Sequence, residues 1–287
     1  MSEIKIEGVG KNYGSTRALK NVDLTLEENK IYGLLGRNGA GKTTLLNIIN
    51  NRIFANEGTV KLDGIDAAES QNVQNQFYFV GEQMLFPENM KVNKAIKWTA
   101  KFYPDFDLGY ADRLADLFEL PRRSKIKALS TGYKSIFKNI LALSVNTPFV
   151  FLDEPVLGLD ANHRELFYKQ LIEKYIRTPS TYVISTHLIE EVANIIEEVV
   201  IIKKGEIIKK ESRDQLLSQG YSVSGTAAAV EGYVKGRNVI GMDTLGRLKS
   251  AYILGIPDKN KAVGLEFSTL DLQKLFIQLT NSQEGIS

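Results

Sequence analysis

The segment Ile31-Tyr32-Gly33-Leu34-Leu35-Gly36-Arg37-Asn38-Gly39-Ala40-Gly41-Lys42-Thr43 decides the fold of this 287-residue chain. Its first five residues form a short apolar run, which predicts a buried strand. The next six residues form a loop with three glycines, and the stretch from Thr44 to Ile49 has the apolar spacing of a helix. Strand, glycine loop and helix in this order predict the opening unit of an α/β fold.

The glycine loop also predicts a phosphate site, because residues 36–43 match the pattern GxxxxGK(S/T). Backbone N–H groups can close around phosphate oxygens where no Cβ obstructs them, and a helix N-terminus then faces the anion. Lys42 would reach the β- and γ-phosphates, and Thr43 would ligate Mg²⁺. We therefore expect ATP and Mg²⁺ as cofactors. The candidate nucleotide contacts in this segment are Gly36, Asn38, Gly39, Gly41, Lys42, Thr43 and Thr44.

Two carboxylates follow a second apolar run, Val150-Phe151-Leu152. Ligands bind at the carboxyl ends of the strands in open α/β sheets. Asp153, nearer the core, is predicted to orient Mg²⁺, and Glu154 is the candidate general base for an attacking water. An apolar run that ends in Asp-Glu is by itself more often a strand reaching the surface. The functional interpretation therefore depends on the phosphate loop.

The segment Leu129-Ser130-Thr131-Gly132-Tyr133-Lys134 precedes an apolar helical stripe, and Ser130 is a natural N-cap. In its order along the chain it resembles the LSGGQ signature of the ATP-binding cassette (ABC) family, although Thr131 and Tyr133 depart from that pattern. Ser130 places a hydroxyl at a helix N-terminus, and Gly132 lets the backbone approach a phosphate. The resemblance covers roughly residues 3 to 217.

The resemblance implies further positions. It implies that Tyr13 stacks on adenine, although a turn tyrosine packed on the sheet is the alternative. His187, at the end of an apolar strand, would contact the γ-phosphate and the attacking water, and Asp160 would lie at a subunit interface. Glu82 stands in the usual glutamine position near the metal, whereas an actual glutamine follows at Gln83, and the sequence leaves both open.

The predicted fold is an α/β P-loop nucleotide-binding core with an antiparallel β subdomain, an inserted helical subdomain and a small C-terminal α/β lobe. We expect the nucleotide-binding domain over residues 1–217, with the helical subdomain at about 84–146, and the accessory lobe over 218–287. A possible capping box at Ser268 and Asp271 precedes a last amphipathic helix.

Composition excludes several other classes of protein. No cysteine and only two histidines occur, so disulfides, thiolate metal sites and histidine-rich metal cages are excluded. Lysine plus arginine (36) nearly balances aspartate plus glutamate (34), which gives no basic field for nucleic acid. The most apolar runs are far shorter than the roughly 20 residues that cross a bilayer, and the N-terminus does not have the pattern of a signal peptide.

The family resemblance implies an ATPase that works as a head-to-tail dimer, with each ATP between one phosphate loop and the partner's signature helix. The partner would be a second copy or a related cassette. We expect a cytoplasmic subunit, held at the inner face of the membrane by a separately encoded permease. The layout resembles bacterial exporter ATPases for drugs, antibiotics or peptides, including amphipathic toxins such as phenol-soluble modulins.

Two alternative functions follow from the same residues. A non-transport ABC ATPase would act on the ribosome or DNA, but the chain has neither a second cassette nor a long heptad insertion. A nucleotide-gated binding module would hydrolyse ATP negligibly, and the presence of Glu154 and His187 argues against it.

Overall fold

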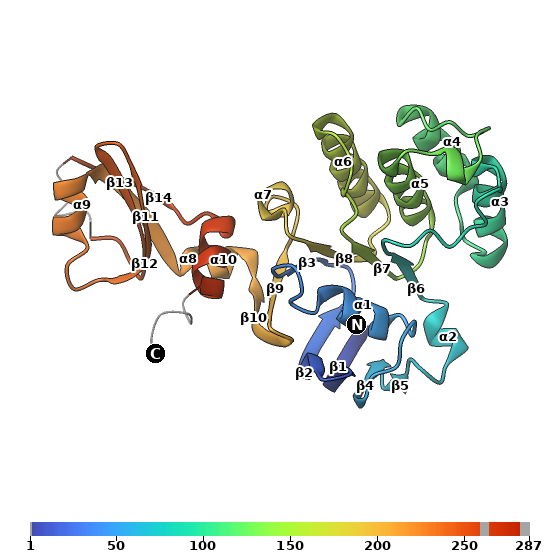
Figure 1. The fold of residues 1–287 in the computed structure, drawn as a ribbon, viewed down its shortest axis with the longest axis horizontal. Helices are drawn as coiled ribbons and strands as arrows, with labels where there is room; N and C mark the ends of the chain where they lie inside the picture. The colour runs from blue at the N-terminus through green and yellow to red at the C-terminus, as the bar shows by residue number, and fades with distance from the viewer. Residues whose placement is uncertain (1, 259–263, 282–287) are drawn as a thin grey trace.

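The computed structural model describes residues 2–258 and 264–281, which form three β-sheets with helices packed against them (Figure 1). The strands are β1 (Glu3–Tyr13), β2 (Thr16–Glu27), β3 (Ile31–Leu35), β4 (Glu57–Leu62), β5 (Ile65–Asp66), β6 (Phe77–Val80), β7 (Phe149–Asp153), β8 (Thr181–Thr186), β9 (Glu198–Lys203), β10 (Glu206–Ser212), β11 (Gly220–Thr226), β12 (Asn238–Leu245), β13 (Leu248–Leu254) and β14 (Leu265–Thr269). The helices are α1 (Lys42–Ile49), α2 (Gln71–Gln74), α3 (Val92–Phe102), α4 (Leu108–Leu117), the 3₁₀ turn η1 (Ile126–Ala128), α5 (Thr131–Ser144), α6 (Ala161–Arg177), α7 (Ile189–Val192), α8 (Arg213–Ser218), α9 (Ala227–Tyr233) and α10 (Leu272–Asn281).

The central sheet positions the site. Its strand order is β10-β9-β3-β8-β7-β6, and every neighbouring pair is parallel except β9 with the edge strand β10. Strands β3, β7 and β8 are buried throughout, because layers cover both faces of the sheet. Parallel strands end at the same edge of a sheet. The loops that follow β3, β7 and β8 therefore meet at one edge.

The antiparallel sheet, with order β2-β1-β4-β5, shares a core with α1 and one face of the central sheet. The sequence Lys11-Asn12-Tyr13-Gly14 has the composition of a turn, but residues 11–13 belong to β1, and the tight turn is at Gly14 and Ser15. Register shifts between Val9 and Asn12 interrupt the alternation of apolar and polar residues. This irregularity hid the end of the strand from the sequence pattern.

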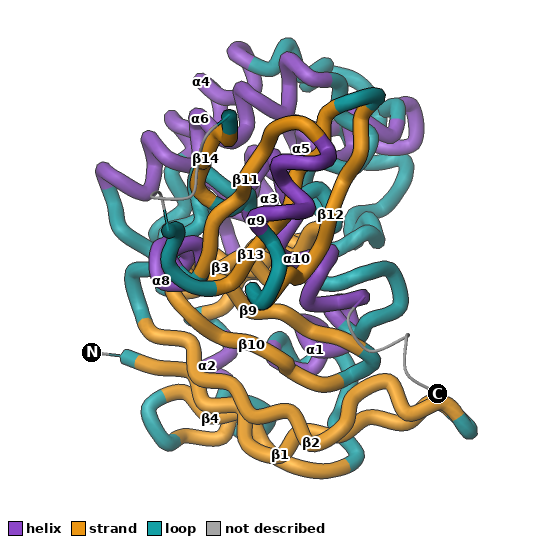
Figure 2. The backbone as a smooth tube through the Cα atoms, turned by 90° about the vertical axis from the view of Figure 1, so that its left-hand side faces the viewer, coloured by secondary structure: helices purple, strands orange, loops and turns teal. Residues whose placement is uncertain are grey.

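The third sheet, with order β12-β13-β11-β14, lies at the opposite end of the long axis from α3 (Figure 1). Helix α9 lies across one face of it, as Figure 2 shows. The apolar runs at residues 250–254 and 263–267 have the pattern of strands. The structure has β13 and β14 there and adds β11 and β12, whereas Val263 lies outside the described residues.

The predicted capping box before α10 is wrong. Ser268 lies in β14, and its hydroxyl shares a 2.6 Å hydrogen bond with the hydroxyl of Ser222 on β11. Asp271 is the residue that caps α10, because its Oδ1 accepts the backbone N–H of Lys274 at 2.9 Å. Pairing with β11 keeps the chain extended through Thr269, which delays the start of the helix.

Helix α10 ties the third sheet to the main core, because Leu272, Leu275 and Phe276 are buried in the same cluster as Ile189 and Val192 of α7. We expect Leu275→Ala to lower the free energy of unfolding by about 2–5 kcal/mol through lost burial and a cavity. Urea unfolding followed by circular dichroism measures this effect. Leu248→Ala, at an exposed leucine of the third sheet, is the control. Equal losses of unfolding free energy in both variants would contradict the buried packing of Leu275.

Within the described residues, none of the helices is both long enough and apolar enough to span a bilayer.

Candidate nucleotide site

The loop between β3 and α1 has the backbone geometry of an anion cradle. Gly39 and Gly41 have φ values of +79° and +111°, a conformation that side chains with a Cβ rarely adopt. A Cβ on Gly41 would also lie 2.9 Å from the carbonyl oxygen of Ala18. Gly36 is buried at the end of β3, whereas Asn38 is exposed. The predicted loop residues therefore meet at the N-terminus of α1.

A cavity of about 290 Å³ opens at this loop. The residues that line it are Ala18, Asn38, Gly39, Ala40, Gly41, Lys42, Thr43, Thr44 and Glu154. It joins the end of β3 to the end of β7, as the parallel sheet requires.

Lys42 is buried at the base of this cavity, and its Nζ donates to the carbonyl oxygen of Gly36 at 2.7 Å. Burial lowers the pKa of Lys42, while the negative charges of Glu154 and Asp153 oppose that shift. The Lys42 ammonium lies 3.8 Å from Oε1 of Glu154. A cation and a carboxylate therefore face the same space.

Glu154 lies between Lys42 and His187. Both of its carboxylate oxygens lie 3.0 Å from Nδ1 of His187, and Thr186 Oγ1 donates to Oε2 at 3.4 Å. Its backbone has φ of +50°, a costly conformation for a residue with a Cβ, and its N–H donates to the carbonyl oxygen of Ser185. The strained backbone turns this carboxylate out of the strand direction of β7 and into the cavity.

Asp153 is buried at the end of β7, and its Oδ1 has no hydrogen-bond partner among the described residues. A buried carboxylate oxygen without a partner is costly unless a cation or water satisfies it. No group of three histidine, aspartate or glutamate side chains in the described chain could hold a metal by itself. The residues here fit a magnesium ion that takes its remaining ligands from a nucleotide and water.

The signature segment caps α5. Ser130 Oγ accepts the backbone N–H of Tyr133 at 3.2 Å, as the sequence predicted for an N-cap. A Cβ on Gly132 would lie 2.8 Å from the carbonyl oxygen of Gly158. Gly132 is therefore needed for the close packing of this segment against the loop that carries Asp160.

Asp160 caps α6. Its carboxylate accepts the backbone N–H of His163 at 2.9 Å and lies 2.8 Å from Nδ1 of the same residue. These contacts with His163 hold the pKa of Asp160 below its usual value. The structure therefore gives Asp160 a role within its own chain, and its role at an interface stays a prediction.

Tyr13 lies at the end of β1, half exposed, with the Nζ of Lys11 5.4 Å from the centre of its ring. Its ring is absent from the buried core of the antiparallel sheet. An exposed ring can stack on a base, so its role toward adenine stays a prediction.

Glu82 and Gln83 are both exposed in the loop after β6. The Nζ of Lys138, on α5, donates to the carbonyl oxygens of Gly81 and Glu82. The charge of Glu82 opposes the lowering of the pKa of Lys138 by burial. Which of Glu82 and Gln83 approaches the metal stays open, because both side chains are exposed.

Sequence reasoning missed Arg164 and Glu191, which connect two loops of the site. Arg164 Nη1 donates to Glu191 Oε1 on α7 at 2.6 Å, and its Nε donates to the carbonyl oxygen of Leu159 at 2.8 Å. Glu191 follows His187 by four residues, and Leu159 precedes Asp160. The closeness of Glu191 to His187 and of Leu159 to Asp160 was the only signal in the sequence. Arg164 and Glu191 themselves are too far apart along the chain for a local pattern to relate them.

Fold and site together define a P-loop nucleotide-binding protein. The family model described as "ABC transporter" matches residues 19–157. The putative ABC transporter ATP-binding protein AlbC of Bacillus subtilis (strain 168) is 32% identical over 202 residues, which cover 67% of this chain and 83% of AlbC. The ABC transporter ATP-binding protein YtrB of the same strain is 29% identical over 213 residues, which cover 74% of this chain and 73% of YtrB.

Among solved structures, the dimeric MJ0796 cassette of a bacterial ABC transporter is 27% identical, with a TM-score of 0.65 over 73% of this chain and 98% of that chain. The chain belongs to the ABC transporter ATP-binding cassette family. It is the ATP-binding and ATP-hydrolysing subunit of such a transporter.

Proposed function

We propose that this chain converts ATP hydrolysis into movement of a membrane permease, with Glu154 as general base and His187 as the residue that orients it. The position of Glu154 carries this proposal: its carboxylate lies 3.8 Å from the Lys42 ammonium and 3.0 Å from the His187 ring. Lys42 would bind the β- and γ-phosphates, which places the terminal phosphorus near the base. Glu154 would accept a proton from the attacking water.

Thr43 and Asp153 would hold Mg²⁺, with Glu82 or Gln83 nearby. When bound, the ion supplies positive charge to the phosphate oxygens. The partnerless Oδ1 of Asp153 supports this assignment. Gly36, Asn38, Gly39, Gly41 and Thr44 would contact phosphates, and Tyr13 would stack on adenine.

We further propose that two cassettes enclose ATP head to tail. Ser130 and Gly132 would contact the ATP bound by the partner, and Asp160 would lie at the interface. The packing of Gly132 on the Gly158 carbonyl supports this, because it brings the two segments together. The dimeric state of the MJ0796 cassette also supports it. The partner is a second copy or a related cassette, and nucleic acid is not expected.

We also propose the division predicted from the sequence, with a nucleotide-binding domain over 1–217, a helical subdomain at about 84–146 and an accessory lobe over 218–287. The separate third sheet, which begins at Gly220, supports this division.

A cavity of about 490 Å³ between the loop after β6 and helix α3 would receive the permease. Leu85, Trp98 and Phe102 line it, with 63%, 40% and 67% of their surfaces exposed. Exposed apolar groups of this size mark an interaction site. Leu85 follows Gln83 by two residues, so an apolar helix end of the permease would sit beside the loop that approaches the nucleotide. Membrane association would then come from the permease.

We expect Phe102→Glu to reduce attachment of this chain to membranes that carry the permease at least about tenfold, because the charge would have to be buried against apolar groups. ATP hydrolysis by the isolated chain should stay unchanged. Sedimentation with permease-containing vesicles measures attachment. Ile176→Glu, at an exposed isoleucine of α6, is the control. Full attachment of the Phe102 variant would exclude this docking site.

We propose export as the direction, with drugs, antibiotics or peptides as cargo. The resemblance of the cassette and the lobe that follows it to bacterial exporter ATPases supports this proposal. ATP-dependent uptake of a fluorescent amphipathic peptide into inside-out vesicles carrying the chain and its permease is expected. Uptake into right-side-out vesicles instead would contradict export.

A further inference from the structure

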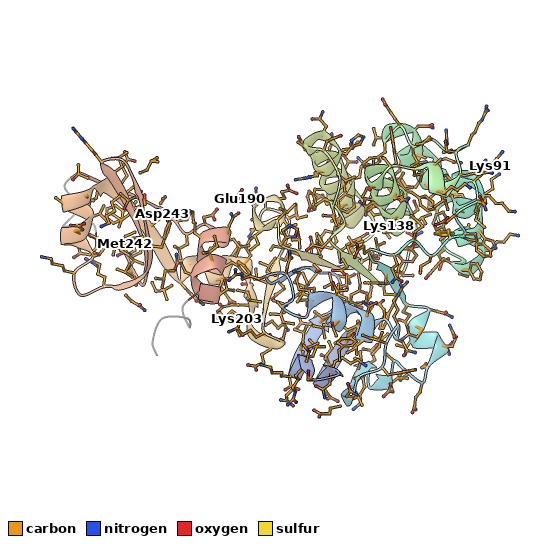
Figure 3. All side chains as sticks on the ribbon, viewed as in Figure 1. Lys91, Lys138, Glu190, Lys203, Met242 and Asp243 are labelled. Carbon is orange, nitrogen blue, oxygen red and sulfur yellow. The ribbon has the colours of Figure 1, made fainter. Side chains whose placement is uncertain are left out.

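Lys138 is the lysine of α5 that lies farthest from the N-terminus of the helix. The residues on either side of it in the helix are buried. Its neighbours Phe137 and Asn139 are buried against the core, and the helix is apolar on most of its surface. Lys138 itself is half-buried on α5, near the central sheet (Figure 3). An apolar side chain would fill this position without losing hydration of a charge.

The Lys138 ammonium bridges two elements. It donates to the carbonyl oxygen of Gly81 at 2.7 Å and to that of Glu82 at 3.2 Å, both in the loop after β6. Burial lowers the pKa of Lys138, while the charges of Glu82 and Asp153 oppose the shift. The cation is therefore held at the loop after β6 by two backbone carbonyls.

The two bridged elements face different nucleotides in the proposed dimer. The loop at 81–83 approaches the ATP of its own subunit, whereas the N-terminus of α5, with Ser130 and Gly132, approaches the ATP of the partner. Lys138 follows Ser130 by eight residues, or about 12 Å along the helix at the usual rise per residue. A helix moves as a rigid rod over this distance, so displacement at Lys138 displaces the Ser130 end.

We propose that Lys138 is a positioning residue that ties the loop at 81–83 to the signature helix, so that nucleotide bound in one subunit sets the position of the helix that contacts the partner's nucleotide. This inference rests on the proposed function of the dimer. The tie consists of charge-assisted hydrogen bonds to backbone carbonyls, which do not depend on whether the side chain at 82 or 83 approaches the metal.

The test uses Lys138→Met, which keeps length and removes both charge and donors. The rate constant kcat for ATP hydrolysis should fall about tenfold, as expected for the loss of a charged hydrogen bond, while KM stays within about twofold. In the Glu154→Gln background, the same change should raise the ATP concentration needed for half-maximal dimer by about tenfold. A merely structural change would not separate kcat from KM.

Lys138→Gln, which is shorter and neutral, is measured beside it and should show the same separation, and circular dichroism confirms that each variant is folded. Lys169→Met, at an exposed lysine of α6, is the control. If wild-type protein hydrolyses ATP and both Lys138 variants match it in kcat and dimerisation, the tie is excluded. A rise in KM that accounts for the whole loss would also exclude it. If the wild-type protein does not hydrolyse ATP and the Glu154→Gln variant does not form the ATP-dependent dimer, the proposed function fails instead.

Discussion

Lys42→Met is expected to abolish ATP hydrolysis and to weaken ATP binding by about tenfold to a hundredfold. The Lys42 ammonium is buried at the base of the phosphate cradle, and one charged hydrogen bond contributes about 1.5–3 kcal/mol. Methionine keeps the length of the side chain but removes the positive charge that would face the β- and γ-phosphates. Fluorescence titration with an ATP analogue and phosphate release measure the two effects.

The Lys42 variant should stay folded. Burial lowers the pKa of Lys42, so its charged form costs folding free energy at neutral pH, and a neutral side chain removes that cost. Its melting temperature should therefore match or exceed that of the wild type. Lys61→Met changes only a surface ion pair with Glu7 and is the control. Unchanged ATP affinity in the Lys42 variant would refute the claim that this loop and Lys42 bind the phosphates of ATP.

Glu154→Gln is expected to lower the rate of hydrolysis by about 10²- to 10⁴-fold while ATP binding is retained. The amide keeps the shape of the side chain but accepts a proton far less readily than a carboxylate does. Single-turnover phosphate release measures the chemical step separately from binding. Glu165→Gln, at an exposed glutamate of α6, controls for the charge change. Wild-type turnover by the Glu154 variant would remove Glu154 from the role of base.

The centre of the site could be predicted because its residues follow short apolar runs. Lys42 begins α1 after the glycine loop that follows β3, Asp153 ends β7, and His187 follows β8. Parallel strands bring these ends to one edge. The order of motifs and apolar runs in the sequence therefore predicted which side chains lie close together in the structure. The fold class followed from the same strands and is confirmed by the solved cassettes.

Contacts between distant segments could not be predicted. Lys138 and Glu82 are 56 residues apart, and Arg164 and Glu191 are 27 apart. No local pattern relates such pairs, since the packing of helices on the sheet decides which side chains meet. The strained backbone of Glu154 was equally hidden. Its N–H donates to Ser185 on another strand, a contact that no local pattern reveals.

The third sheet was predicted only in part for a related reason. Strand β11 has the sequence GYSVSGT, whose glycines and serines indicate a loop, yet it pairs with both β13 and β14. Tyr221 and Val223 are buried beneath α9, which fixes the strand by burial rather than by local preference. Pairing with strands that are distant in the sequence therefore makes this segment a strand.

The most direct test of an ATP-enclosing dimer is the oligomeric state of Glu154→Gln, measured by light scattering with and without ATP and Mg²⁺. We expect a monomer without nucleotide and twice that mass with ATP and Mg²⁺, because slow hydrolysis would preserve the γ-phosphate contacts at both sites. A protein that binds ATP and yet keeps the mass of a monomer would contradict the claim that two copies of this chain enclose the nucleotide.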